Sequence, residues 1–366
     1  MALTAFTALW LSGCASSAQP DLSTAYAHAT LISLAHRHHV CAVAIALIKD
    51  RKLDSIGSAS GCLPGTRVQA DSVFQAASLS KPVFAYAVLK LVAQGKMALD
   101  VPVMTYLPTG YRHRFDPMKA APSELVSDPR LQAITVRMVL NHTSGLPNWA
   151  GGPLRFASAP GAEWHYSGEG YVLLQRAVEA VTGQPLDRFM RAQVFRPLAM
   201  NHSSYIWNEV LATKLLPGTK VNGKSRATSN LIQPIAAFSL YTTAEDYAKF
   251  LAAVLSDTDV LQQVVASPFA VDPRFDLSWG LGWGIEGGQE GPTIWQWGNN
   301  PGYRAFVIAS VRSGDGFVML TNSENGLALA EPMAQKVLKR EHKLFRSSML
   351  DGGPFNWLCN ALHVCF

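Results

Sequence analysis

The chain has 366 residues, of which 48% are hydrophobic and 16% are charged, and its formal net charge is +5. So many apolar side chains can bury a large core, which excludes intrinsic disorder as the main state and, at about 150 residues per domain, predicts roughly two folding units. The positive excess is modest, and the longest basic run, residues 36–39 (HRHH), is too short to follow a phosphate backbone, so we expect no nucleic-acid partner.

Residues 1–20 are predicted to be a signal segment. Their apolar run ends at residues 11–14 (LSGC), short of the roughly 20 residues that a membrane-spanning helix needs. This string resembles a bacterial lipobox, which would make Cys14 the lipid-modified first residue of a periplasmic protein anchored to the outer membrane. Because no Lys or Arg precedes the apolar run, two alternatives stay open: ordinary cleavage after residues 16–18 (SSA), and a cytoplasmic start.

A helix over residues 21–38 is predicted to lead into a β-hairpin. Residues 40–48 alternate and are rich in β-branched side chains, residues 49–52 (KDRK) form a turn, and residues 53–60 return. Cys41 and Cys62 lie equally far from the turn, so we expect them to face each other and to form a disulfide in an oxidising compartment. Cys359 and Cys365 are expected to close a small C-terminal loop, and four separate buried thiols are the alternative.

The middle of the chain is predicted to be mostly helical, and strands return near its end. Helical segments at 81–93, 171–182 and 243–255 are joined by loops rich in Pro and Gly. Strands follow at 293–297, 303–311 and 316–321, with a turn at 299–302 (NNPG) and a closing helix at 327–340.

This order of elements predicts an α/β (α+β) fold in which one antiparallel sheet is assembled from both ends of the chain and flanked by helices. The sheet domain would comprise residues 21–80 and 280–345. Residues 81–279 would form a mostly helical inserted domain, and residues 346–366 a C-terminal tail.

A nucleophile is suggested by the spacing of Ser78 and Lys81 at the start of a predicted buried helix. Residues three apart share a helix face, so the Lys81 amine would reach the Ser78 hydroxyl. The helix N-terminus adds free N–H groups that can stabilise an oxyanion. If Lys81 is buried, desolvation favours its neutral form, which can accept the Ser78 proton.

A series of ordered strings resembles the serine β-lactamase-like family, which holds class C β-lactamases, D-alanyl-D-alanine carboxypeptidases and related esterases. The resemblance extends over roughly residues 40–330, and it implies the β-lactamase/transpeptidase-like fold. The strings that carry it are FQAASLSK (74–81), LDVPVMTYLP (99–108), LNHTSGLP (140–147), PLAM (197–200), TAED (243–246), WGLGW (279–283) and LTN (320–322).

The family's second catalytic element is Tyr-x-Asn, and residues 166–168 (YSG) occupy it here. The resemblance implies that the Tyr166 phenol relays a proton among Ser78, Lys81 and the leaving group. Gly168 stands where the family has Asn, so the side-chain amide that would bond Lys81 or substrate must come from elsewhere or be dispensed with. His142, within residues 140–147, is expected to brace a loop.

The third element, Lys-Thr-Gly or His-x-Gly in the family, corresponds to Gln296, Trp297 and Gly298. Gly298 would let a substrate backbone lie flush against the strand edge. The N–H groups of Ser78 and Asn299 are the expected oxyanion hole. Gln296 is neutral, so a carboxylate-bearing β-lactam would lose its usual charge partner. Arg304 is a candidate to replace that positive charge; the alternative is that Arg304 is a solvated strand residue without a role in binding.

The resemblance thus implies a serine hydrolase that acts through an acyl-enzyme on an ester, a D-amino-acid peptide or, weakly, a β-lactam. It implies no metal or organic cofactor and no membrane contact beyond the lipid anchor. Two alternatives are a penicillin- or peptidoglycan-binding protein of the same fold with little turnover, and a non-catalytic scaffold.

Overall fold

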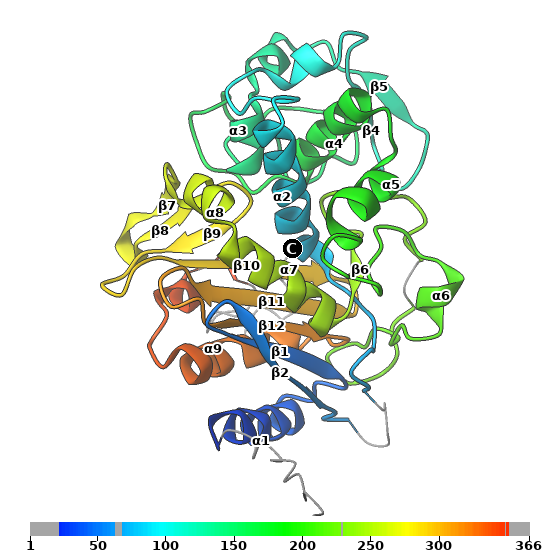
Figure 1. Ribbon diagram of the computed structural model, residues 1–366. Coiled ribbons are helices and arrows are strands. Elements are labelled where there is room, and N and C mark those ends of the chain that lie inside the picture. The colour runs from blue at the N-terminus through cyan, green and yellow to red at the C-terminus, as the bar shows by residue number, and fades with distance from the viewer. Residues whose placement is uncertain (1–21, 63–67, 228–229, 348, 351–366) are drawn as a thin grey trace, which may run out of the picture.

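An eight-stranded antiparallel sheet forms the centre of the protein, with the strand order β2-β1-β12-β11-β10-β9-β8-β7 (Figure 1). The computed structural model describes residues 22–62, 68–227, 230–347 and 349–350. The strands are β1 (Val43–Lys49), β2 (Lys52–Ala59), β7 (Phe269–Asp272), β8 (Leu277–Trp279), β9 (Gly284–Glu286), β10 (Thr293–Asn300), β11 (Tyr303–Ser310) and β12 (Gly316–Thr321). The predicted sheet built from both ends of the chain is confirmed. β7 and β8 also join it, although they precede the predicted boundary at residue 280.

The N-terminal hairpin turns at Asp50 and Arg51, whose φ angles of 49° and 63° are those of a tight two-residue turn between β1 and β2. The register shifts between Leu47 and Ile48, and the paired residues end at Val43 and Ala59. Cys41 and Cys62, just beyond this last pair, form the predicted disulfide, with Cα atoms 4.5 Å apart. Cys14, Cys359 and Cys365 lie outside the described residues.

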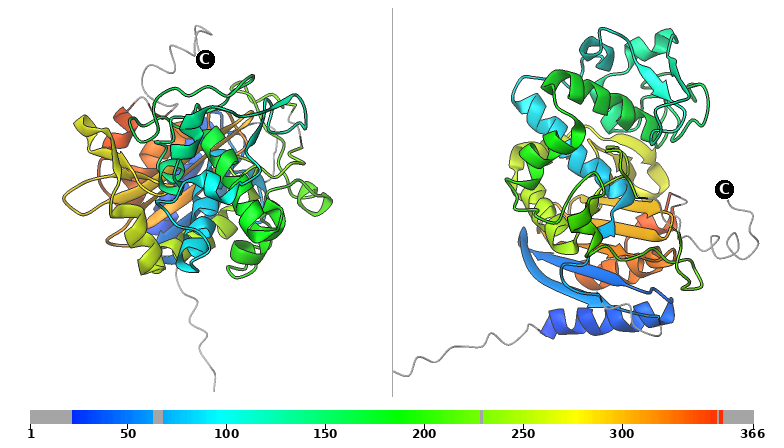
Figure 2. Two further views of the ribbon diagram at one scale, coloured as in Figure 1. Left: turned by 90° about the horizontal axis from the view of Figure 1, so that it is seen from above. Right: turned by 90° about the vertical axis from the view of Figure 1, so that its right-hand side faces the viewer.

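Alternating side chains give the sheet two separate cores. Ala44 and Val318 face the helices that include α2 (Ser80–Ala93) and α7 (Ala244–Ser256). Ile45 and Phe317 face the other way, against α1 (Leu22–Arg37) and α9 (Ala330–Leu338). Figure 2 shows α1 and α9 on the far side of the sheet from the largely helical part of the molecule. This arrangement follows from the period of two along a strand.

The helical part carries α3 (Val136–Leu140), α4 (Gly168–Thr182), α5 (Leu186–Met190), α6 (Glu209–Ala212) and α8 (Thr258–Val265). It also holds two short strand pairs, β3 (Phe74–Gln75) with β6 (Tyr241–Thr242), and β4 (Arg112–Arg114) with β5 (Ser123–Leu125). The side chains of Ser167 and Thr243 cap α4 and α7, which confirms the two helices predicted there. None of the helices described combines the length and the apolar character needed to cross a membrane.

Candidate active site

Ser78 lies in a single 3-10 turn, Ala77–Leu79, immediately before α2. Ala77 has a φ of 49°, which is unfavourable for a residue with a Cβ, so its neighbours must hold it in place. The Ser80 hydroxyl donates to the Ala77 carbonyl at 2.6 Å and accepts from the Leu240 N–H at 3.0 Å. The Tyr247 hydroxyl donates to the Leu79 carbonyl at 3.0 Å. Ser78 is therefore presented by a turn whose flanking carbonyls, those of Ala77 and Leu79, are held by side-chain hydrogen bonds.

Lys81 is the second residue of α2, three positions after Ser78, and its Nζ is 3.0 Å from the Ser78 Oγ. The same Nζ donates to the Ala237 carbonyl at 2.9 Å, and it lies 4.6 Å from the centre of the Tyr166 ring. Only 1% of Lys81 is exposed. Burial lowers its pKa from 10.5 to about 7, because desolvation penalises the charged ammonium form. A neutral amine is thus available beside the hydroxyl near neutral pH.

Tyr166 completes the group from the segment before α4. Its hydroxyl is buried and approaches Ser78 and Gln296 without completing a well-aligned hydrogen bond to either. Burial raises the pKa of Tyr166 above its ordinary value, and the nearby Ser78 and Gln296 side chains offset only part of that rise. The phenol is therefore neutral near pH 7, so it can pass on a proton but cannot serve as the resting base.

The His142 side chain packs against the Tyr166 ring. The two rings lie 4.4 Å apart, and the His142 Nδ1 accepts a hydrogen bond from the Ser167 N–H at 3.1 Å. Burial, together with the charge of Lys81, places the pKa of His142 well below its usual value. A neutral imidazole that accepts a backbone N–H has the bracing role predicted from the sequence.

Gly168 has no space for the asparagine of the family pattern. A Cβ added there would lie 2.6 Å from the Trp149 ring and 2.7 Å from the Asn148 carbonyl oxygen. The missing side-chain amide is replaced, on the Lys81 side, by the backbone carbonyl of Ala237.

The segment that supplies this carbonyl was not found by sequence reasoning. Gln175 fixes it: its Oε1 accepts from the Ala236 N–H at 2.9 Å and its Nε2 donates to the Pro234 carbonyl at 2.8 Å. Because Ala237 acts only through its backbone, no residue-type signal marks it.

The third predicted element lies on β10. β9 pairs only with Thr293–Trp295, so the later part of β10 turns its edge toward the 3-10 turn that carries Ser78. Gln296 is fully buried, and its Oε1 accepts from the Trp297 N–H at 3.1 Å. Gln296 therefore lies below the surface beside the Tyr166 hydroxyl, and Trp297 and Asn299 border the open space.

The structure adds detail on Gly298 and on Arg304, which lies on the neighbouring strand β11. A Cβ on Gly298 would lie 2.4 Å from the Ala76 carbonyl oxygen and 3.1 Å from the Ala77 Cβ. The glycine therefore makes room for the segment before Ser78, and the predicted contact with a substrate backbone stays a prediction. Arg304 donates from Nη1 to the carbonyls of Asn300 (3.0 Å) and Tyr303 (2.9 Å), so this nitrogen binds the β10–β11 turn.

We expect Gly298→Ala to lower kcat/KM for an ester substrate by about 100-fold, since displacing reacting groups by even 1 Å has an effect of this size. The added methyl group would push β10 away from Ala76 and separate Asn299 from Ser78. Gly151→Ala is the matched control, because Gly151 borders the same space and has no atom within 4 Å of its Cβ position. Equal activity of the two variants in a p-nitrophenyl ester assay would contradict this interpretation.

A cavity of about 820 Å³ opens above Ser78. This size suits a small organic ligand. Aromatic side chains form part of its walls: the rings of Trp149 and Phe238 meet edge to face at 5.4 Å, and the rings of Trp297 and Tyr166 lie 5.0 Å apart and tilted by 35°. Sequence reasoning missed most of the wall, whose described members beyond the predicted site are Phe115, Asp116, Pro117, Met118, Asn148, Trp149, Ala150, Gly151, Glu169, Phe238, Asn300, Pro301 and Met349.

Comparison with known proteins agrees with this geometry. Residues 27–341 match the Beta-lactamase family. The chain is 33% identical over 174 residues to Esterase EstB of Burkholderia gladioli, covering 39% of this chain and 41% of the esterase. It is 32% identical over 199 residues to Penicillin-binding protein 4 of Amycolatopsis lactamdurans, covering 49% of this chain and 48% of that protein. The chain thus spans less than half the length of these two relatives.

The crystal structure of D-alanine carboxypeptidase AmpC from Burkholderia cenocepacia superposes with a TM-score of 0.72 at 18% identity, covering 87% of this chain and 98% of that chain. At this identity the likeness supports the fold alone. The family match, however, extends over most of the sequence and contains Ser78, Lys81 and Tyr166. The chain belongs to the Beta-lactamase family.

Proposed function

We propose that the protein is a serine hydrolase that cleaves an ester or amide through an acyl-enzyme. The observation that carries this proposal is the 3.0 Å approach of the Lys81 amine, with a pKa of about 7, to the Ser78 hydroxyl at the floor of a cavity. A hydroxyl needs an adjacent base to become a good nucleophile, and a base titrating near the working pH is the most effective one.

In the acylation step the neutral Lys81 amine accepts the Ser78 proton as Oγ bonds to the substrate carbonyl carbon. The carbonyl π electrons move onto the oxygen, where the N–H groups of Ser78 and Asn299 stabilise the negative charge. As the tetrahedral adduct collapses, the bond to the leaving group breaks. The leaving group takes the proton, passed from the Lys81 ammonium through the Tyr166 hydroxyl.

Deacylation repeats these steps with water. Lys81 accepts a proton from the water molecule as its oxygen attacks the ester carbon, and the proton returns to Ser78 Oγ as the acid departs. No atom is left on the enzyme, so the cycle closes.

Esters and D-amino-acid peptides fit this site at least as well as β-lactams. Gln296 is uncharged and buried, so it offers no cationic partner to a carboxylate. The relative that is named an esterase supports ester substrates. The Cys41–Cys62 disulfide supports an exported, periplasmic protein, because such bonds persist in oxidising compartments; attachment of a lipid at Cys14 belongs to the same proposal.

We expect Ser78→Ala to abolish hydrolysis of p-nitrophenyl esters and labelling by a fluorophosphonate. Both should be measured beside nitrocefin and a D-Ala-D-Ala peptide. A fluorescent penicillin separates the alternatives: label that clears from Ser78 within minutes indicates an enzyme, and label that persists indicates a binding protein. Undiminished ester hydrolysis by Ser78→Ala would refute the proposal.

A further inference from the structure

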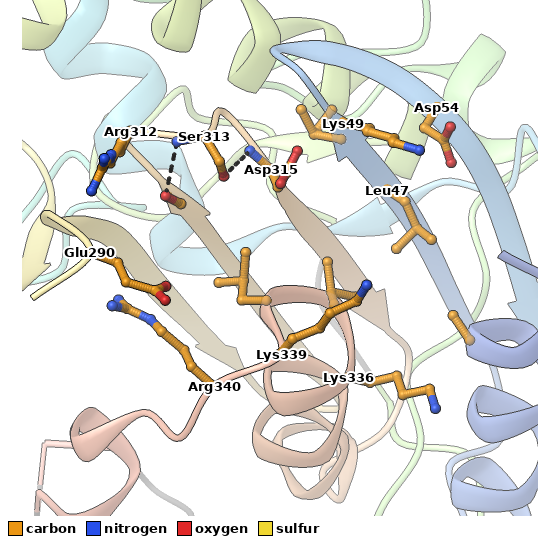
Figure 3. Close-up of a pocket in the computed structure, with 15 residues that line it drawn as sticks. Leu47, Lys49, Asp54, Glu290, Arg312, Ser313, Asp315, Lys336, Lys339 and Arg340 are labelled. Carbon is orange, nitrogen blue, oxygen red and sulfur yellow. Dashed lines mark hydrogen bonds between the residues drawn. The ribbon is translucent and has the colours of Figure 1, made fainter. Parts of the chain in front are cut away.

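The catalytic cavity is acidic in a chain whose net charge is +5. Among its described lining residues, the acidic side chains are Asp116 and Glu169, and none is Lys, Arg or His. A second cavity, of about 660 Å³, lies between the β1–β2 hairpin and the end of α9 (Figure 3). It has charges of both signs, including Lys339 and Asp315, so an acidic lining is not general to the hollows of this protein.

Glu169 is built into the wall of the catalytic cavity. It is 2% exposed and lies in the first turn of α4, where the helix dipole favours an anion. Its Oε1 accepts from the Ala150 N–H at 2.9 Å, and its Oε2 is 3.3 Å from Nε2 of the fully buried His113. The other nitrogen of His113, Nδ1, is 3.8 Å from Glu124 Oε1. One imidazole thus lies between two acidic side chains.

Asp116 adds a second negative charge. Its carboxylate accepts from the Met118 N–H at 2.9 Å and pairs at 3.1 Å with Lys119, whose side chain is 71% exposed. A solvated pair of this kind is weak, so it leaves much of the Asp116 charge uncompensated. Among the described residues, the one Lys or Arg that is buried is Lys81, which already bonds Ser78 and Ala237.

We propose that this cavity selects ester and amide substrates that carry an ammonium group on the acyl part, and rejects those that carry a carboxylate there. Glu169 and Asp116 are the residues that determine this specificity, and the faces of Trp149 and Trp297 can add cation–π attraction. The inference rests on the proposed hydrolase function. It adds a preference for the charge of the substrate, which Ser78, Lys81 and Tyr166 do not determine.

Three p-nitrophenyl esters of similar length test the proposal: those of 6-aminohexanoate, of hexanoate, and the mono-ester of adipate. We expect kcat/KM for the ammonium ester to exceed that for the carboxylate ester about tenfold at low salt and less at high salt. Glu169→Gln and Asp116→Asn should each move the ratio of these two kcat/KM values, ammonium ester to carboxylate ester, toward one. Glu163→Gln, which changes a side chain 65% exposed and outside the cavity, should keep the parent ratio. A parent ratio of one or below, or a ratio that both cavity variants leave unchanged, overturns the inference.

A binding measurement keeps this test separate from the test of catalysis. Calorimetric titration of Ser78→Ala with phenethylammonium, 2-phenylethanol and phenylacetate should find the cation bound most tightly. Attraction to the net positive surface would favour phenylacetate, so it cannot mimic this result. If the parent protein hydrolyses no ester, the hydrolase proposal fails while the binding order still decides the charge selection. If Glu169→Gln does not fold, the ratio of kcat/KM values in the parent protein and in Asp116→Asn still tests the proposed charge selection.

Discussion

Lys81→Met is expected to lower kcat/KM for an ester by about 1,000-fold, within the range that a positioned general base contributes. Methionine fills a similar volume but cannot accept the Ser78 proton. In the parent protein, kcat/KM should rise as pH increases through about 7, the pKa of Lys81, and then level off, because the neutral amine is the active form. The variant's residual activity should lack this rise. Lys90→Met, on the same helix and in an ion pair with Asp257, is the matched control and should retain the parent rate.

The same substitution should stabilise the fold. Since the pKa of Lys81 falls from 10.5 when unfolded to about 7 when folded, the unfolded chain binds one more proton between these values. The free energy of unfolding of the parent must therefore rise with pH over this window and be lowest below pH 7, by roughly 3 kcal/mol or more. Lys81→Met removes that dependence. Urea unfolding of both proteins at about pH 6 and about pH 9 measures the effect, and equal pH dependence of the two would show that Lys81 is not desolvated.

Tyr166→Phe should slow acylation by about 100-fold or more, because the leaving group would lose its proton donor. The ring would still pack on His142 and Trp297, so the fold should be preserved. Tyr171→Phe is the matched control: its ring also lies near Lys81, at 5.7 Å, but its hydroxyl faces the Leu140 carbonyl at 3.4 Å. Stopped-flow acylation rates would compare the two. Similar losses in both variants would assign the effect to packing around Lys81 and remove Tyr166 from proton transfer.

Local sequence patterns predicted the elements that depend on neighbours in the chain. The helix that contains Lys81 and the strand at 316–321 both follow from short-range periodicity. β10 was predicted to end at residue 297, but its pairing with β11 continues to Asn300 opposite Tyr303, so only Pro301 and Gly302 form the turn. The short strands β7, β8 and β9 were missed because three or four residues carry little periodicity and their pairing is set by the sheet.

The residues of the candidate site also fall into those that local sequence predicts and those that only the fold brings together. Ser78 and Lys81 are three residues apart, so helix geometry alone brings them together. The contact from Ala237 crosses 156 positions of sequence and uses a backbone carbonyl, which no motif encodes. Glu169 is a common residue type in a helical first turn, and only the fold shows that it faces the cavity. Met349 lies in the predicted tail, and its place in the cavity wall likewise depends on the path of the whole chain.

Rapid mixing of the parent protein with excess p-nitrophenyl acetate, followed by acid quench and peptide mass spectrometry, tests the central claim most directly. The account predicts a burst of one p-nitrophenol per protein molecule and one acetyl group on the peptide that contains Ser78. A burst with the acetyl group on any other residue, or steady turnover with no acetylated peptide, would contradict it.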